Sequence, residues 1–205
     1  MRIQSVSWAP EPGRHGEVQV PVGLNYHHLN DVDVRRAMRT LWLEEFADLE
    51  TNWTVDACYG KQLTPAGWDA FRDAMPQALE AHDDEWLRSQ MGNHSYWEDY
   101  LLRRGKPVDY NKPDAIQKLT IGEFNIAYIR GLATVLQTRG QEMCVIYRAD
   151  DAYVPRSECS AWEDQEIRVS DVLAGHRVRY HPPPGDRRAF SVPSGPNCHH
   201  SIRAI

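Results

Sequence analysis

The chain is poor in the residues that hold many small metal-stabilised and disulfide-stabilised folds together. Its 205 residues include four cysteines, Cys58, Cys144, Cys159 and Cys198, and no two of them form a CxxC pair. A zinc ribbon of the usual kind is therefore excluded. Because the first residues also lack the apolar core of a signal peptide, we expect a protein that is made in the cytoplasm and not secreted. Disulfides are rare in that reducing compartment.

Long apolar runs and an excess of basic residues are also missing. No segment approaches the roughly 20 apolar residues that a membrane-spanning helix needs. The chain has 23 Lys and Arg against 29 Asp and Glu, a net charge of −6. A protein that wraps nucleic acid needs a basic face. We therefore expect no membrane contact, and nucleic acid only as a minor contact of the late basic stretch at residues 168–188.

The common catalytic patterns are absent too. The sequence has no GxSxG, GxxxxGK[ST], HExxH or GxGxxG, so the nucleophile elbow, phosphate loop, zinc pair and dinucleotide loop that these patterns build are not expected. Two acidic segments could bind a cation. We interpret HDDE at residues 82–85 as a solvated helix start, where carboxylates favour the helix dipole. We interpret WEDQE at residues 162–166 as a polar turn.

What the first half does contain is helical periodicity. After a Pro- and Gly-rich arm at residues 1–30, Asn30 or Asp31 can cap a helix. Its apolar face follows steps of three and four residues: Val34, Met38, Leu41, Trp42, Phe46 and Leu49. A second helix begins at Thr64, and Pro76 is expected to kink or break it. These signals predict a helical region at residues 31–110.

The second half begins after the turn-rich segment at residues 103–114, and residues 111–205 are expected to form a separate domain. Thr120 and Glu123 have the spacing of a capping box, which predicts a helix over residues 121–139. Gly140 should end that helix, and residues 143–149 read as a buried strand. The fold class expected is α+β, with a helical N-terminal half and a small C-terminal α/β domain that ends in a pinned, loop-rich tail.

The order of elements in residues 115–205 carries a family resemblance. The helix holds Glu123, Ala127 and Gly131 at four-residue steps. An acidic turn with Asp151, Cys159, Trp162 and Glu163 follows, and the chain closes on Pro196, Asn197, Cys198 and His200. In this order the segment resembles the phage Mu F-type head morphogenesis proteins, which are minor capsid proteins of tailed phages. It departs from their pattern at Arg156 and His200, where the family has cysteines, and at Gly195, where it has a histidine.

The resemblance implies a structural role. A minor capsid or head-assembly protein would be part of the virion and contact other virion proteins, the major capsid protein or the portal, in an oligomeric assembly. An enzymatic activity is not implied. We expect the tail to fold back onto the acidic turn, with Ile202 and Ile205 buried.

A zinc clasp could pin this tail. Zinc in structural sites takes four thiolate or imidazole ligands. Cys159, Cys198 and His200 would supply three of them, and His176 or His181 the fourth. The competing interpretation is that the cysteines are small buried residues and the histidines are polar surface residues.

A nuclease of the His-Me finger (HNH-like) class is the alternative function, because PNCHH is similar to the end of such domains. His176 or His181 would be the general base, and a divalent metal would hold the phosphate. Only five residues follow His200, too few for the metal-binding helix that this class needs.

Overall fold

The computed structural model describes residues 24–52, 62–150, 159–178, 189–194 and 198–205. These residues form five α-helices, two short 3₁₀ helices and five strands. The α-helices are α1 (Val32–Asn52), α3 (Pro65–Ala81), α4 (Asp84–Gln90), α5 (Lys112–Thr138) and α6 (Val169–Gly175). The strands are β1 (Leu101–Arg103), β2 (Lys106–Val108), β3 (Met143–Arg148), β4 (Glu166–Arg168) and β5 (His200–Ala204). The 3₁₀ helices are η1 (His94–Tyr96) and η2 (Cys159–Ala161). The mixed α+β class and the helical N-terminal half are confirmed.

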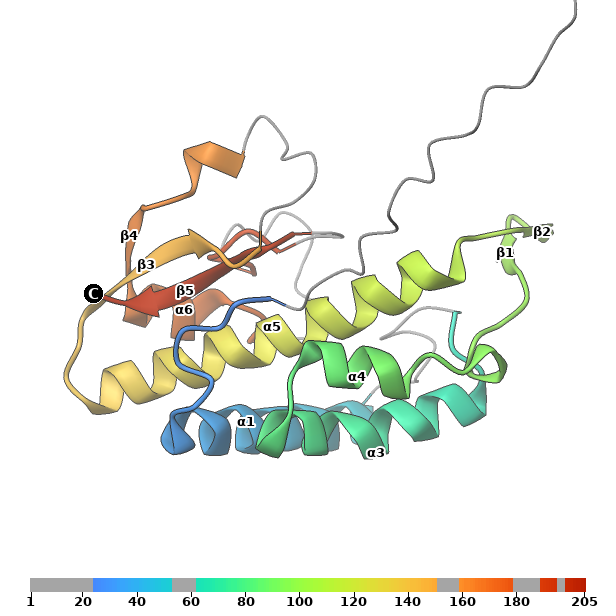
Figure 1. The fold of residues 1–205 in the computed structure, drawn as a ribbon, viewed down its shortest axis with the longest axis horizontal. Coiled ribbons are helices and arrows are strands. Elements are labelled where there is room, and N and C mark those ends of the chain that lie inside the picture. Colours follow the sequence, from blue (N-terminus) through green and yellow to red (C-terminus); the bar gives the residue numbers. More distant parts are fainter. Residues whose placement is uncertain (1–23, 53–61, 151–158, 179–188, 195–197) are drawn as a thin grey trace, which may run out of the picture.

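Helix α5 joins the two halves of the chain. It lies between a helical layer made of α1, α3 and α4 and a three-stranded antiparallel sheet with α6 beside it (Figure 1). Strand β3 is central in this sheet, with β4 on one side and β5 on the other. The buried side chains of both halves belong to one continuous hydrophobic core.

The first helices begin where their capping residues predict. The Asp31 carboxylate accepts a hydrogen bond from the Asp33 backbone N–H at 3.0 Å, and the Thr64 hydroxyl accepts one from Gly67 at 3.1 Å. Pro76 was expected to kink or break α3, and the helix continues past it to Ala81 without a break. Ala74, Met75, Ala78 and Leu79, on either side of the proline, are buried. This packing offsets the helical hydrogen bond that the proline cannot donate.

The long helix begins earlier than its sequence suggests. Asn111 caps α5 by accepting a hydrogen bond from Asp114, and Pro113 occupies the first turn. The capping box at Thr120 and Glu123 is therefore wrong, because Thr120 lies inside the helix and its hydroxyl donates to the Ile116 carbonyl at 3.0 Å. Gly140 follows the end of the helix with φ of +75°, as expected of glycine.

The expected strand at residues 143–149 is confirmed as β3, whose four central residues are buried. The chain then returns twice to this strand. Strand β4 pairs with its first half and β5 runs along most of its length, both antiparallel.

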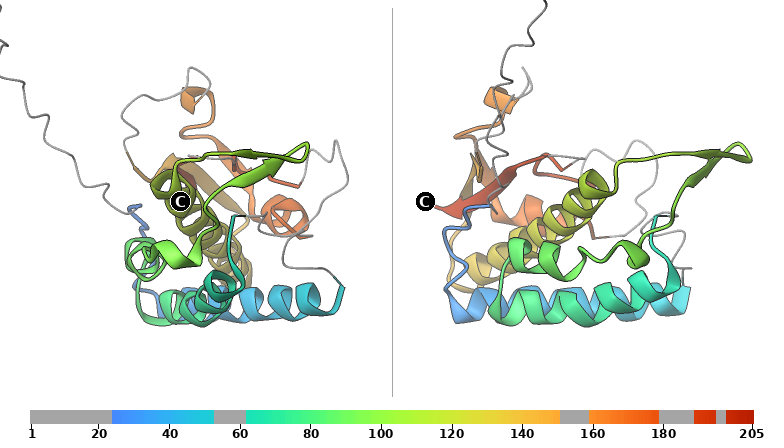
Figure 2. Two further views of the ribbon diagram at one scale, coloured as in Figure 1. Left: turned by 90° about the vertical axis from the view of Figure 1, so that its right-hand side faces the viewer. Right: turned by 45° about the vertical axis from the view of Figure 1, so that its right-hand side comes forward.

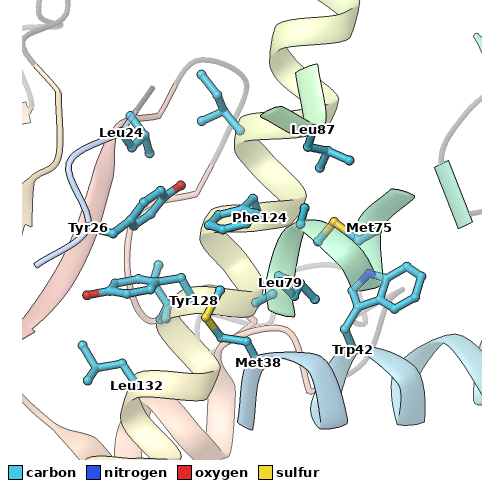
Figure 3. Packing of buried hydrophobic residues seen from close by; sticks show 14 of the residues in the cluster. Leu24, Tyr26, Met38, Trp42, Met75, Leu79, Leu87, Phe124, Tyr128 and Leu132 are labelled. Carbon is cyan, nitrogen blue, oxygen red and sulfur yellow. The ribbon is translucent and has the colours of Figure 1, made fainter. Parts of the chain in front are cut away.

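The core is centred on aromatic residues of α5. Phe124 and Tyr128 face Met38 of α1 and Met75 and Leu79 of α3 (Figure 3). Gly131 also belongs to this contact, because a Cβ built on it would lie 2.5 Å from the Met38 Cγ and 2.8 Å from its backbone nitrogen. Gly131 therefore packs against helix α1.

The last residues of the N-terminal arm lie on this core. Tyr26 is buried against the rings of Phe124 and Tyr128, with centroids 5.2 and 4.7 Å apart. The Asn25 N–H donates to the Ala149 carbonyl at 2.7 Å. The Nε2 of His28 accepts a hydrogen bond from the Ala204 N–H at 3.2 Å. Residues 1–23 of the expected arm lie outside the described residues.

A β-hairpin stands at the far end of the molecule from the sheet. Among the described residues, strands β1 and β2 pair only with each other, and the turn between them has φ of +51° at Arg104 and +76° at Gly105. Figure 2 shows the hairpin extending beyond the helices. The segment at residues 103–114, expected to separate two domains, thus contains the end of the hairpin and the start of α5.

Candidate functional site

The C-terminal tail is docked as an edge strand. Strand β5 pairs with β3 from Cys144↔Ala204 to Arg148↔His200. The buried Asn125 side chain of α5 donates to the His200 carbonyl at 2.7 Å. Ile202 is fully buried, as expected, whereas Ile205 is exposed, contrary to expectation.

His200 connects the two cysteines of the expected clasp. Its Nδ1 lies 3.3 Å from the Cys198 sulfur, and its Nε2 lies 3.2 Å from the Cys159 carbonyl oxygen. A carbonyl only accepts, so Nε2 carries the proton and Nδ1 faces the Cys198 sulfur. The Cys198 thiol donates to the Pro193 carbonyl at 2.9 Å. Burial lowers the pKa of His200, against the opposing effects of the Cys159 carbonyl and Glu163. The neutral imidazole therefore holds the tail against η2.

Two of the three expected zinc ligands have donor atoms that face each other, the Cys198 sulfur and the His200 Nδ1. Cys159 contacts the imidazole through its main-chain oxygen. Within the described ranges, no group of three or more His, Cys, Asp or Glu side chains is placed to hold a metal ion. His181 lies outside these ranges. The zinc clasp stays a prediction, which elemental analysis of the purified chain can test.

His176 is held in a different environment. It is fully buried, its ring meets Phe190 edge-on at 5.7 Å, and its Nδ1 lies 3.5 Å from the Val192 N–H. Burial, reinforced by Arg130 and Arg177, lowers the pKa of His176 to about 3. A fully buried ring cannot reach a substrate, so His176 does not suit the general base of a nuclease.

The acidic turn supplies an ion pair. The Glu163 carboxylate accepts from both Nε, at 2.8 Å, and Nη2 of Arg148 at the end of β3. Its Oε1 also lies 4.0 Å from the His200 Nε2. Asp164 follows with φ of +60°, and its N–H donates to the Ile146 carbonyl at 2.8 Å. The segment at residues 162–166 is thus the polar turn that leads into β4, and Asp151 lies outside the described residues.

A buried charge network is the most developed polar feature of the described chain. Arg177 donates from Nε to Glu45 at 2.9 Å. Its Nη1 and Nη2 hold the two oxygens of Glu123 at 2.9 and 2.8 Å. Arg130 donates to the carbonyls of His176 and Arg177 at 2.8 and 2.7 Å. Burial raises the pKa of Glu45, and Arg177 opposes that shift. The network ties α1, α5 and the segment after α6 together.

Sequence reasoning singled out Glu123 but missed Glu45, Arg130 and Arg177. A signal was present, because Glu45 follows Trp42 by three residues on the buried stripe of α1, where an apolar residue is expected. Charged residues at such positions need a buried partner. The pattern predicts a buried ion pair without naming the partner.

The acidic segment HDDE is a helix start, as expected, but it is only partly solvated. Asp83 caps α4 by accepting from the Trp86 N–H at 2.8 Å. Asp84 is buried, and its Oδ2 accepts from the Leu24 N–H at 3.3 Å. Burial raises the pKa of Asp84 to about 6 from an ordinary value of 3.8, with Asp83 adding to the shift and the Leu24 N–H and Arg88 opposing it.

Replacing Asp84 with asparagine should therefore stabilise the protein above neutral pH. The pKa of Asp84 is higher in the folded state than in the unfolded state, so the folded protein is favoured when the carboxyl is protonated. This contribution to the free energy of unfolding is complete below the unfolded-state pKa. It is lost as pH rises through the folded-state pKa. In Asp84→Asn, the loss of stability between about pH 4 and pH 6 should be absent. At higher pH the free energy of unfolding should exceed that of the wild type by roughly 1–3 kcal/mol. Urea unfolding at several pH values measures it. Asp73→Asn, at a carboxylate that is 76% exposed, is the control, and an unchanged pH profile in Asp84→Asn would contradict the assignment.

Deleting residues 198–205 should loosen the sheet. The deletion leaves one edge of β3 unpaired, removes Ile202 from the core and leaves the buried Asn125 amide without its acceptor, which alone costs about 1–3 kcal/mol. We expect a lower melting temperature and faster amide exchange along β3. Deletion of Ile205 alone, which is 67% exposed, is the control. Equal stability of the two truncated chains would show that the tail contributes nothing.

Comparisons with known proteins found no relative of this chain. No protein-family model, curated protein or solved structure matches the chain. Among the described residues, no helix is long and apolar enough to cross a membrane.

Proposed function

We propose that the chain is a structural protein of tailed-phage heads, a minor capsid or head-assembly protein that contacts the capsid or the portal. One observation carries the proposal. Among the residues on which the family resemblance rests, Glu123, Gly131, Glu163 and His200 help to hold the fold.

These four residues make structural contacts, whereas Trp162, which also belongs to the resemblance, is 42% exposed. Glu123 binds the Arg177 guanidinium inside the protein. Gly131 allows α1 to approach α5. Glu163 pairs with Arg148, and His200 holds the tail on η2. Catalytic residues must reach a substrate. These four residues instead face the protein interior or are paired, which supports a structural role.

The proposal places the chain in the virion, assembled in the bacterial cytoplasm. Its partners would be the major capsid protein, the portal and other copies of the chain. Exposed aromatic and aliphatic side chains supply contact surface, among them Tyr100 and Leu102 on the hairpin and Trp162 after η2. Apolar groups of this kind gather at protein–protein interfaces.

The test is whether the chain is part of assembled heads. Particles from cells that encode it should be separated on density gradients into DNA-free and DNA-filled heads, and the protein should be quantified by mass spectrometry against the major capsid protein. We expect a constant ratio in both kinds of head. Absence from washed heads of both kinds would overturn the proposal.

A second experiment, on the purified chain, tests the nuclease alternative. Purified chain should leave linear DNA intact in the presence of Mg²⁺ or Mn²⁺. Cleavage that disappears in His181→Ala but persists in His176→Ala would instead support a nuclease and contradict the structural role as the main function.

A further inference from the structure

Strand β1 has an open outer edge. The β1–β2 hairpin is a sheet of two strands, and among the described residues neither strand pairs with a third. Alternate residues of an antiparallel pair turn their backbone N–H and C=O outward. Pro107 of β2 has no N–H and suits an outward position, so Leu102, its partner in the ladder, also turns its N–H and C=O outward. The side chain of Leu102 is 57% exposed, so this edge is accessible to another strand.

The other edge of the hairpin, along β2, is protected. Pro107 removes the donor that an added strand would need there, whereas β1 contains no proline. The hairpin also has little support of its own, because no residue of either strand is buried. Two-stranded hairpins are marginally stable in water until further strands are added. Pairing at the edge of β1 would therefore stabilise the hairpin.

The charges of the hairpin are divided between its tip and its base. The tip carries three cations, Arg103, Arg104 and Lys106. The base carries three carboxylates, Glu98, Asp99 and Asp109. Asp99 has an ion-pair partner in Lys112 at 3.0 Å, but its side chain is 92% exposed and can accept a second cation. Two hairpins side by side in antiparallel orientation would place each cationic tip beside an acidic base, whereas parallel hairpins would place tip beside tip.

We propose that β1 of one copy of this chain pairs with β1 of a second copy, antiparallel and around a twofold axis at Leu101. In this register Leu102 of each copy lies opposite Tyr100 of the other, and Arg103 lies opposite Asp99. Leu102 and Tyr100 are two residues apart, so both turn their backbone groups outward and can exchange two hydrogen bonds. The occupant is a second copy because the segment from Asp99 to Arg103 complements itself when it is reversed.

Apolar side chains add to the pairing. Tyr100 and Leu102 lie on one face of the hairpin because side chains alternate along a strand, and Tyr100 is 52% exposed. The proposed register brings the Tyr100 ring of each copy beside the Leu102 side chain of the other. Cross-strand pairs between aromatic and apolar residues are among those that stabilise sheets.

The shape of the molecule allows this contact. The hairpin extends beyond the helices (Figure 2), so two hairpins can lie side by side with the helical layers at opposite ends. Asp99 and Tyr100 form a bend before β1 in the single chain, and we expect pairing to straighten it. A contact that uses the same surface on both copies closes as a dimer. The inference deepens the proposed structural role, which includes contacts between copies, although it can be tested on the purified chain alone.

Sedimentation velocity over a wide range of protein concentrations tests the contact. The wild-type chain should form dimers and no larger species. Arg103→Glu and Asp99→Arg should each weaken dimerisation about tenfold or more, because each variant places like charges at both cross-copy pairs. Arg168→Glu, at an exposed arginine outside the hairpin, is the matched control and should dimerise as the wild type does.

Mixing the two hairpin variants gives the decisive result. The altered Glu of the first faces the altered Arg of the second, while Asp99 of the first faces Arg103 of the second. Every cross-copy pair is then attractive, so we expect the mixture to form heterodimers at concentrations where each variant alone is monomeric. Failure to form them, with both variants folded by circular dichroism, would overturn the proposal.

A substitution at the open edge shows whether the strands themselves pair. Leu102→Pro removes the outward N–H and should abolish dimerisation, whereas Leu102→Val keeps the N–H and should not. Equal dimerisation of these two variants would overturn the strand pairing. A wild-type chain that stays monomeric at all concentrations, or whose hairpin binds duplex DNA instead of a second copy, would also overturn it. A monomeric chain would leave the gradient test of the head protein unaffected, so the two proposals fail separately.

Discussion

Replacing Gly131 with leucine should destabilise the protein by about 3 kcal/mol or more, although leucine is the better helix former. A Cβ at this position would lie 2.5 Å from the Met38 Cγ, 2.8 Å from its nitrogen and 3.0 Å from its Cα. The side chain of Met38 could move aside, but its backbone could not without shifting α1. We expect a melting temperature lower by about 2–4 °C for each kcal/mol lost in a chain of this size.

Alanine substitutions at two glycines of the same helix separate packing from helix propensity. Gly131→Ala should also destabilise, because a single methyl group already meets the Met38 backbone. At Gly122 nothing lies within 4 Å of the built Cβ, so Gly122→Ala should stabilise by up to about 1 kcal/mol. A stabilising effect at both positions would show that α1 and α5 are farther apart than the structure places them.

Much of the fold follows from local sequence patterns. The stripe on α1, the Thr64 cap, the glycine after α5 and the apolar run of β3 each depend on residues close together in the chain, and each appears where it was predicted. The start of α5 was missed because two cap signals compete. Asn111 followed by Pro113 is as good a start as Thr120 with Glu123, and Glu123 is used instead to bind Arg177.

The candidate site depended on contacts between distant residues, which local patterns do not determine. The tail could be predicted to dock because its apolar Ile202 needs a buried position. That His200 would bridge Cys198 and the Cys159 carbonyl could not be predicted, since it depends on the register of β5 on β3. For the same reason the pairing of Glu45 with Arg177, 132 residues apart, was not predicted.

Replacing Arg177 with methionine should destabilise the protein at neutral pH by about 3–5 kcal/mol, the usual cost of leaving buried charges without a partner. Arg177 is 5% exposed and contacts both Glu45 and Glu123. Methionine keeps much of the side-chain volume, so the loss reports the charge and its hydrogen bonds. Arg168→Met, at an exposed arginine paired with Asp171, should change stability by less than about 1 kcal/mol.

The pH dependence of the Arg177→Met variant shows whether its loss of stability comes from the carboxylates that are left without a partner. Burial already raises the pKa of Glu45, so the stability tied to its protonated form is present at low pH and is lost as pH rises through its folded-state pKa. Without Arg177, the opposing attraction is gone and this pKa rises further. The deficit of Arg177→Met should therefore grow as pH rises above the ordinary range of a glutamate carboxyl. Adding Glu45→Gln and Glu123→Gln should recover part of the stability and flatten the profile, because amides leave no buried charge. A deficit that is independent of pH and persists in the triple variant would mean that Arg177 acts through packing alone.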